Sequence, residues 1–336
     1  MKLKPISQQV VVITGASSGI GRATALSSAA RGAKVVAGAR DESGLESLVA
    51  QIKQQGGHAI QRVCDVADAK QVNELAQAAV DRYGRIDTWV NNAGVMLYAT
   101  FEQTTVEEFR RIIDVNLMGQ VYGCKAALPH LKREGGALIC VSSVESKVSL
   151  PLQSAYAASK HAVVGFLDAL RIELKGEGAP VSVTNILPAS INTPLFSHAR
   201  TKIGVKPQGA PPIYQPQIVA DAIIYAAETP VRELIAGGAG KFIISAQKIA
   251  PALLDFALSK TGFDAQKTTE PKSENAPDNL FHPIAEGRVE GDMTPKARSV
   301  STYTLMELHP WTTALVAAGV LGGAGLFWLS RRVRAS

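Results

Sequence analysis

The chain has 336 residues, of which 46% are hydrophobic and 19% charged, and its formal charge is +6. This composition excludes a disordered protein, and with 29 glycines and 17 prolines it also excludes a collagen-like or proline-rich fibre. The length allows one large domain with an appendage, or two small domains. There is no long basic run with interleaved aromatic residues, so a nucleic-acid partner is not expected.

The cysteines, the histidines and the N-terminus indicate whether disulfides or metal sites are expected and in which compartment the protein folds. Cys64, Cys124 and Cys140 are too few and too far apart for a disulfide framework or a zinc cluster, so we expect reduced, mostly buried thiols. The six histidines show no ligand spacing, and no metal site is predicted. The first residues lead directly into a strand-like run without a signal peptide, which predicts a cytosolic folded part.

Short apolar runs alternate with longer helical patterns over the first 190 residues. The strands are expected at 10–13, 34–39, 59–64, 86–90, 137–141 and 181–187. Continuous apolar runs of this kind suit strands that are covered on both faces, as in a parallel sheet. Repeated strand–helix units predict a Rossmann-type, doubly wound α/β sheet flanked by helices.

The pattern changes after residue 187. Residues 189–217 are rich in turn formers, and the expected elements that follow are a helix over 217–227, a strand over 232–236 and a helix over 241–259. Residues 1–260 are therefore predicted to form the main domain. Residues 261–310 lose apolar content and predict a flexible linker, in which Leu280 and Phe281 are the candidates for local docking.

The C-terminal region contains an uncharged run of 19 residues over 311–329. At 1.5 Å per residue a helix of this length spans about 28 Å, close to the thickness of a hydrocarbon core. Trp311 and Trp328 stand at the ends of the run, and a basic tail over 331–336 follows. We predict a hydrophobic helix over 311–330 that anchors the domain in a membrane, with the side of the tail left open. The alternative is a C-terminal helix buried in the fold or at a dimer interface.

A glycine-rich turn follows the first strand, with the sequence Thr14-Gly-Ala-Ser-Ser-Gly-Ile-Gly21, and a helical pattern begins at once. Such a turn lets the backbone approach a pyrophosphate and points helix N–H groups at negative charge. The alternative is an ordinary glycine-rich turn.

Four further features occur in a fixed order along the chain. Asn91-Asn-Ala-Gly94 follows the fourth strand, Asn116 stands in Asp-Val-Asn-Leu, Ser143 precedes Tyr156 by 13 residues, and Tyr156-Ala-Ala-Ser-Lys160 opens a helix. Together with the glycine turn, they resemble the short-chain dehydrogenase/reductase family over about residues 8–245.

The resemblance implies a nicotinamide cofactor and assigns residues to it. Asp65 and Val66 would hold the adenine, and Thr193 would contact the nicotinamide carboxamide. The family's usual Pro-Gly after the sixth strand is Pro188-Ala189 here, which leaves the path of the following loop open. The full set of implied cofactor residues is Thr14, Gly15, Ser17, Ser18, Gly19, Ile20, Gly21, Arg40, Asp65, Val66, Asn92, Ala93, Gly94, Tyr156, Lys160, Ile191 and Thr193.

The end of the second strand bears on the choice between the two dinucleotides. A carboxylate there accepts hydrogen bonds from a ribose diol and repels a phosphate. This chain has Arg40 at that place, and its planar, permanently charged guanidinium is well matched to a 2′-phosphate. The adjacent Asp41 weakens the argument, because it can neutralise Arg40 or bind the diol itself. We predict NADP(H), with NAD(H) as the alternative.

The spacing of Tyr156 and Lys160 places them on one face of a helix, one turn apart. A phenol has a pKa near 10, and a nearby ammonium lowers it toward the range useful for acid–base catalysis. A solvated helix face is the alternative for this pair taken alone. By resemblance, Tyr156 would exchange the proton of the carbonyl oxygen and Lys160 would also bind the nicotinamide ribose. Ser143 would orient the carbonyl, and Asn116 would hold a water of the proton relay.

The substrate is expected to be a lipophilic carbonyl or alcohol compound. The segment 190–214 carries apolar side chains that suit a lid, although they can equally cap the core. Two other functions stay open, namely nucleotide sensing without turnover, and an isomerase or dehydratase with transient hydride transfer. By resemblance, a homodimer or homotetramer would form through the helix after Asn116 and the helix that carries Tyr156.

Overall fold

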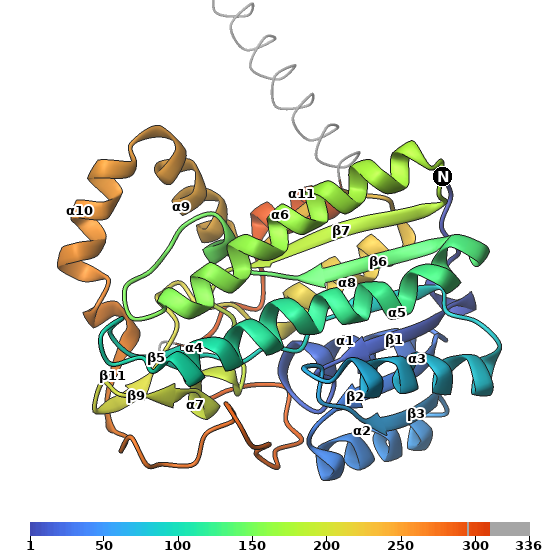
Figure 1. Cartoon of the computed structure of the whole chain (residues 1–336), viewed down its shortest axis with the longest axis horizontal. Coiled ribbons are helices and arrows are strands. Elements are labelled where there is room, and N and C mark those ends of the chain that lie inside the picture. The colour runs from blue at the N-terminus through green and yellow to red at the C-terminus, as the bar shows by residue number, and fades with distance from the viewer. Residues whose placement is uncertain (294–295, 310–336) are drawn as a thin grey trace, which may run out of the picture.

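The computed structural model describes residues 1–293 and 296–309 (Figure 1). The predicted hydrophobic helix over 311–330 and the basic tail over 331–336 lie outside the described residues. In the part that is described, no helix combines the length and apolar character needed to cross a membrane.

The core of the fold is a seven-stranded sheet in the order β10-β7-β6-β4-β1-β2-β3, and all of its neighbouring strands are parallel. Its strands are β1 (Val10–Thr14), β2 (Lys34–Ala39), β3 (His58–Val63), β4 (Thr88–Asn91), β6 (Gly136–Val141), β7 (Val181–Pro188) and β10 (Glu233–Ala236). The order reverses between β1 and β4, as in a doubly wound sheet. The predicted Rossmann-type fold is confirmed.

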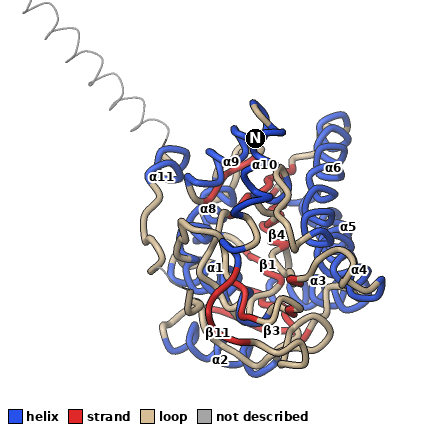
Figure 2. Tube along the Cα trace, turned by 90° about the vertical axis from the view of Figure 1, so that its left-hand side faces the viewer, coloured by secondary structure: helices blue, strands red, loops and turns tan. Residues whose placement is uncertain are grey.

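Helices cover both faces of this sheet (Figure 2). One face packs against α1 (Gly19–Ala30), α2 (Glu42–Gln54) and α8 (Pro216–Glu228). The other packs against α3 (Ala69–Tyr83), α4 (Val106–Ile113), α5 (Gly119–Glu134) and α6 (Ser154–Gly176). Because both faces are buried, the strands carry apolar runs such as Val10–Thr14, whose five residues are all buried.

Local capping explains where several helices begin and end. The Asp68 side chain accepts hydrogen bonds from the N–H groups of Lys70 and Gln71 at the start of α3, and Gly84 with φ = 80° ends that helix. At the start of α4, Thr105 and Glu108 form a capping box.

The structure departs from the sequence prediction after β10. The single helix expected over 241–259 is two helices, α9 (Gly238–Ile249) and α10 (Pro251–Thr261). Pro251 has no N–H to continue the ladder of α9, and Ala250 before it leaves the helical region with φ = −143°. The remaining elements are short: β5 (Leu97–Tyr98), α7 (Leu195–His198), β8 (Arg200–Thr201), β9 (Val205–Pro207), β11 (Lys267–Pro271) and α11 (Thr302–Leu308).

Several parts of the stretch 261–310, predicted to be a flexible linker, pack against the domain. β11 pairs with β9 in antiparallel fashion, Leu280 is fully buried, and α11 packs on α8 and β10. Much of this docking uses hydrogen bonds between the segment's backbone and the domain, and these need little apolar content. The docking expected at Leu280 is found, and the stretch makes further contacts that its low hydrophobicity does not indicate.

Candidate active site

A cleft of about 230 Å³ lies beyond the carboxyl ends of the strands, beside the point where the strand order reverses. Most of the predicted cofactor and catalytic residues line it. These are Gly15, Ser17, Ser18, Gly19, Ile20, Arg40, Asp65, Val66, Asn92, Ala93, Gly94, Ser143, Tyr156, Lys160, Ile191 and Thr193. The other three predicted residues, Thr14, Gly21 and Asn116, lie just behind its wall.

The glycine turn between β1 and α1 fits a dinucleotide for steric reasons. Gly15 has φ = 67°, and a Cβ on Gly21 would lie 2.2 Å from the Gly15 carbonyl oxygen, so the turn can close only with glycine at both places. The Thr14 hydroxyl oxygen accepts a hydrogen bond from the Asn92 N–H at 3.0 Å. This bond fixes the turn to the segment after β4, which forms the opposite wall of the cleft.

Asn116 lies in a π-helical turn over Asp114–Met118 that joins α4 to α5. Its side chain accepts a hydrogen bond from the Val95 N–H at 2.8 Å and donates to the Val95 carbonyl at 3.0 Å and to the Ser159 hydroxyl at 3.3 Å. Such π turns interrupt the regular helical hydrogen bonds and are frequent at functional sites. Asn116 therefore joins the helix, the β4 loop and α6 directly behind the cleft.

Ser143, Tyr156 and Lys160 are brought together at the end of β6. The Ser143 hydroxyl accepts a hydrogen bond from the Glu145 N–H at 3.1 Å, which fixes the turn after the strand. The Lys160 Nζ lies 5.4 Å from the centroid of the Tyr156 ring and donates to the Val141 carbonyl at 3.1 Å. The solvated helix face considered for Tyr156 and Lys160 is excluded, because both side chains are buried.

Burial dominates the electrostatics of this group. It raises the pKa of Tyr156 above its ordinary value, Glu145 acts in the same direction, and the Ser143 side chain opposes them. It lowers the pKa of Lys160 to about 8, and it raises that of Glu145 to about 8. The lowering of the Tyr156 pKa expected from Lys160 is therefore not found, because burial outweighs it. Before any ligand binds, the site holds a protonated phenol and a weakened ammonium.

Tyr98, Glu145 and Gln153 also line the same cleft, among other polar residues that the sequence analysis missed. The Tyr98 hydroxyl, the Glu145 Oε2 and the Gln153 Oε1 atoms are buried and have no hydrogen-bond partner among the described residues. Buried polar atoms are normally paired, so these three are candidates for contact with a bound substrate. Only Glu145 carries a sequence signal, because it stands two residues after Ser143 in the same turn.

Arg40, Asp65 and Val66, which are expected to bind the adenosine part of a cofactor, line the same cleft. Burial lowers the pKa of Arg40 from its ordinary value, and a guanidinium keeps its charge at neutral pH. The Asp65 carboxylate pairs with Arg111 at 2.7 Å, and the Val66 side chain packs against Gly119, where a Cβ would lie only 2.7 Å from it.

The loop after β7 takes an ordinary path despite the alanine at position 189. The Ala189 N–H donates to the Ala236 carbonyl at 2.9 Å, so the strand pairing continues. A Cβ at Gly237 would lie 2.8 Å from the Ala189 side chain, and Gly237 has φ = 110°. A glycine at 237 therefore makes room for the alanine.

The apolar lid predicted over 190–214 is divided between two roles. Leu195 and Phe196 line the cleft, together with Gly209 and Ala210. Ile213 and Tyr214 are only 1% and 4% exposed and do not line it. For these last two, capping of the core is the correct interpretation.

Comparisons with known proteins agree with this geometry. The short chain dehydrogenase family model matches residues 9–204. The uncharacterized oxidoreductase YxnA of Bacillus subtilis is 39% identical over 327 residues, which cover 96% of this chain and 92% of that protein.

Two solved structures are also similar. The alcohol dehydrogenase of the archaeon Thermococcus sibiricus, complexed with 5-hydroxy-NADP, is 30% identical with a TM-score of 0.60, and the match covers 68% of this chain and 95% of that one. A short chain dehydrogenase/reductase of Burkholderia phymatum in complex with NAD is 24% identical with a TM-score of 0.67, and the match covers 81% of this chain and 99% of that one. At this identity the match shows similarity of fold alone. The chain thus belongs to the short chain dehydrogenase/reductase family of oxidoreductases.

Proposed function

We propose that this protein is an NADP(H)-dependent oxidoreductase that interconverts a carbonyl compound and the corresponding alcohol. The observation that carries the proposal is the buried group of Ser143, Tyr156 and Lys160 at the end of β6, in a cleft whose other end is the glycine turn. Arg40 at the adenosine end favours NADP(H) over NAD(H).

The roles of the side chains follow from their positions. When bound, the nicotinamide supplies or accepts the hydride. In the direction of reduction, the Ser143 hydroxyl orients the carbonyl oxygen, and the Tyr156 hydroxyl gives that oxygen its proton as negative charge develops there. The raised pKa of Tyr156 keeps this hydroxyl protonated, which is the state that can donate. The Lys160 ammonium stabilises the phenolate that is left behind.

The walls of the substrate end suggest the class of substrate. Met96, Leu195 and Phe196 are apolar, whereas Glu145 and Tyr98 offer polar atoms without partners in the described chain. We therefore propose a lipophilic carbonyl or alcohol compound that carries one further hydrogen-bonding group.

Consumption of NADPH tests this function directly. With ketones and aldehydes of increasing apolar size, each with and without a second hydroxyl, we expect net oxidation of NADPH and release of an alcohol. The rate should be highest for members with an apolar frame and a hydroxyl. An isomerase or dehydratase would release product with no net NADPH consumption, and a nucleotide sensor would bind NADPH without turnover. Either result would contradict the proposal.

We also propose that the domain lies in the cytosol, held at a membrane through residues 311–330. One supporting feature is a row of exposed apolar side chains on α9 and α10, in which Phe242, Ile249, Leu253 and Phe256 are 63% to 83% exposed. Lysines that can face anionic lipids accompany the row at positions 241, 248 and 260. Tyr303 of α11, close to the end of the described chain, packs among apolar side chains of the same two helices.

Fractionation tests the anchor. Full-length protein should pellet with membranes and resist carbonate extraction, whereas a fragment ending at residue 309 should stay in the supernatant. The fragment keeps Leu308, whose side chain is buried against the domain, so its solubility would not reflect a damaged core. Recovery of full-length protein in the detergent-free soluble fraction would refute the anchor.

A homodimer or homotetramer remains part of the proposal. On α6, Ala158, Ala162, Phe166 and Leu170 recur every four residues and are half-buried or exposed, so they form a partly accessible stripe. Phe166 and Leu170 also pack in part against the core. Ala157 and Val163 of the same helix are buried and lie outside this stripe.

A further inference from the structure

A C-terminal segment, residues 278–293, lies along the open side of the cofactor cleft. The Gly19 N–H of the glycine turn donates to the Arg288 carbonyl at 3.0 Å. Farther along, the Gly291 N–H donates to the Asn192 carbonyl at 3.0 Å. The segment thus reaches from the phosphate-binding turn to the loop after β7. It lies wholly outside the matched family region, which ends at residue 204.

This segment holds the side chain of Arg40. One guanidinium nitrogen donates to the Asn279 carbonyl, and the other donates to the Phe281 carbonyl at 3.1 Å. A guanidinium has five N–H donors, so three remain for another ligand after these two bonds. Backbone carbonyls carry no net charge. The segment therefore fixes the orientation of Arg40 and leaves its positive charge in place.

The same segment also forms a hydrogen bond with the neighbouring carboxylate, that of Asp41. Asp41 Oδ1 accepts hydrogen bonds from the Ser43 hydroxyl at 2.8 Å and the Gly44 N–H at 3.0 Å, which cap α2. Asp41 Oδ2 accepts one from the Glu286 N–H at 3.1 Å. A carboxylate at the end of β2 would otherwise be free to bind a ribose diol. Here both of its oxygens already have donors from the protein.

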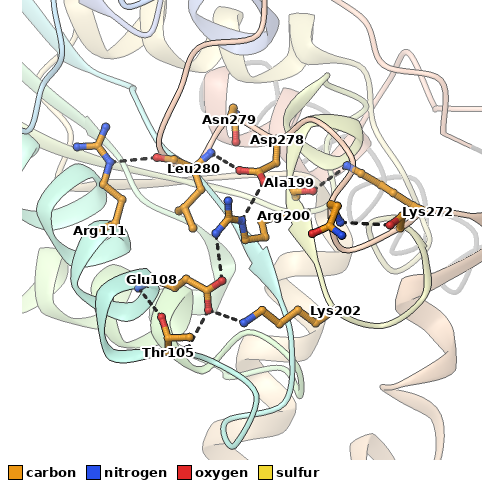
Figure 3. A network of polar contacts seen from close by, with 12 residues as sticks. Thr105, Glu108, Arg111, Ala199, Arg200, Lys202, Lys272, Asp278, Asn279 and Leu280 are labelled. Atoms are coloured by element: carbon orange, nitrogen blue, oxygen red, sulfur yellow. Dashed lines mark hydrogen bonds and ion pairs between the residues drawn. The ribbon is translucent and has the colours of Figure 1, made fainter.

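An anchor fixes the beginning of the segment (Figure 3). Asp278 pairs with Arg200 at 2.8 Å and accepts a hydrogen bond from the Leu280 N–H at 2.9 Å. Arg200 is in turn paired with Glu108 of α4 at 3.2 Å. The Leu280 side chain is fully buried, and its carbonyl accepts a hydrogen bond from Arg111 at 3.0 Å. The carbonyls of residues 279–281 are thereby held in place above Arg40.

We propose that residues 279–286 form part of the binding site for the cofactor's 2′-phosphate, because they orient Arg40 toward it and keep Asp41 engaged. This inference rests on the proposed use of NADP(H). Asp278, which acts through the carbonyls that follow it, is a positioning residue. Asn279, Pro283 and Ile284, which line the cleft at this end, form its outer wall.

Direct binding of the two dinucleotides tests the proposal without turnover. We would titrate full-length protein with NADPH and with NADH, follow the fluorescence of the bound nicotinamide, and take the ratio of the two dissociation constants. In Asp278→Ala the preference for NADPH should fall about tenfold, as expected when a charge-assisted contact loses its alignment. The matched control is Asp292→Ala on the same segment. It removes an ion pair with Lys206 away from Arg40 and should leave the ratio unchanged.

A second pair of variants addresses Asp41 separately. Glu286→Pro removes the N–H that binds the carboxylate, whereas Glu286→Ala removes only the side chain. The proline variant should bind NADH about threefold more tightly than the alanine variant, because one carboxylate oxygen becomes available to the ribose diol.

A double-mutant cycle shows whether the segment acts through Arg40. Arg40→Ala should abolish most of the preference, and adding Asp278→Ala to it should then change the ratio less than twofold. Equal effects of Asp278→Ala in both backgrounds would overturn the inference, and so would a wild-type ratio in Asp278→Ala itself. If the wild-type protein bound both dinucleotides equally well, the NADP(H) preference and this inference would fall together.

Discussion

Replacement of Tyr156 by phenylalanine should lower kcat for carbonyl reduction by about 10²–10⁴-fold and leave NADPH binding nearly unchanged. The substitution removes only the hydroxyl that gives the carbonyl oxygen its proton. The ring stays in its buried place beside Lys160, so the fold and the cleft are preserved. Steady-state NADPH oxidation gives the rate, and NADPH fluorescence without substrate gives the affinity.

The cleft contains a second buried tyrosine, Tyr98, whose replacement by phenylalanine is the control for the assignment of Tyr156 as the proton donor. Tyr98 also lines the cleft, its hydroxyl has no partner among the described residues, and burial raises its pKa well above the ordinary value. It lacks the neighbouring ammonium and the serine that Tyr156 has. Tyr98→Phe should therefore affect mainly KM. If Tyr98→Phe lost the rate and Tyr156→Phe kept it, Tyr98 would be the proton donor and our assignment would be wrong.

The sheet and the catalytic group were predictable because their signals are local. A buried parallel strand needs a continuous apolar run, and such runs marked β1, β2 and β6. The edge strand β3 is half exposed, and its weaker pattern includes Gln61 and Arg62. The glycine turn needs glycine at positions 15 and 21 for steric reasons, so its sequence shows its shape. The spacing of Tyr156 and Lys160 on one helix likewise follows from helical geometry.

Apart from the docking at Leu280, the contacts of the C-terminal segment were not predictable in this way. Its contacts join residues far apart in the sequence, such as Arg40 and Asn279, which are separated by 239 positions. They also use backbone carbonyls, which every residue has, so no residue type identifies them. Low hydrophobicity predicted a linker, because residues 261–279 contain almost no large apolar side chain besides Phe263.

Glu145 illustrates a different limit of the sequence. Glutamate is a common residue of exposed turns, and nothing around position 145 indicates that the fold buries it. Burial is a property of the tertiary structure, since it depends on how Tyr98, Tyr156 and Lys160 are assembled around the turn. The unusual pKa that results is therefore visible only in the folded protein.

The buried carboxyl of Glu145 should make the protein less stable as the pH rises, and Glu145→Gln should remove this effect. In the folded chain its pKa is about 8, mainly through burial, against 4.5 for an ordinary glutamate. Between these values the folded state keeps a proton that the unfolded state has released. The contribution of this group is thus fully present below pH 4.5 and is lost as the pH rises to 8.

Denaturant unfolding at a series of pH values measures the difference between the wild-type protein and Glu145→Gln. The free energies of unfolding should be similar at pH 5, where the buried carboxyl is neutral like the amide that replaces it. By pH 8 the variant should be more stable by about 4 kcal/mol at most, because each pH unit in this range costs the wild-type protein about 1.4 kcal/mol. Glu102→Gln, at an exposed position, controls for the general loss of one carboxylate.

The same residue links stability to function. The buried carboxyl of Glu145 lowers the free energy of unfolding at neutral and alkaline pH. Groups that reduce stability in this way are characteristic of sites that bind a ligand. Glu145→Gln keeps a neutral hydrogen-bonding group and should leave KM nearly unchanged, whereas Glu145→Leu should raise KM for substrates that carry a second hydroxyl and not for those without one. Parallel pH curves for the two proteins would show that Glu145 is ionised throughout, and the role given to its neutral carboxyl would then be refuted.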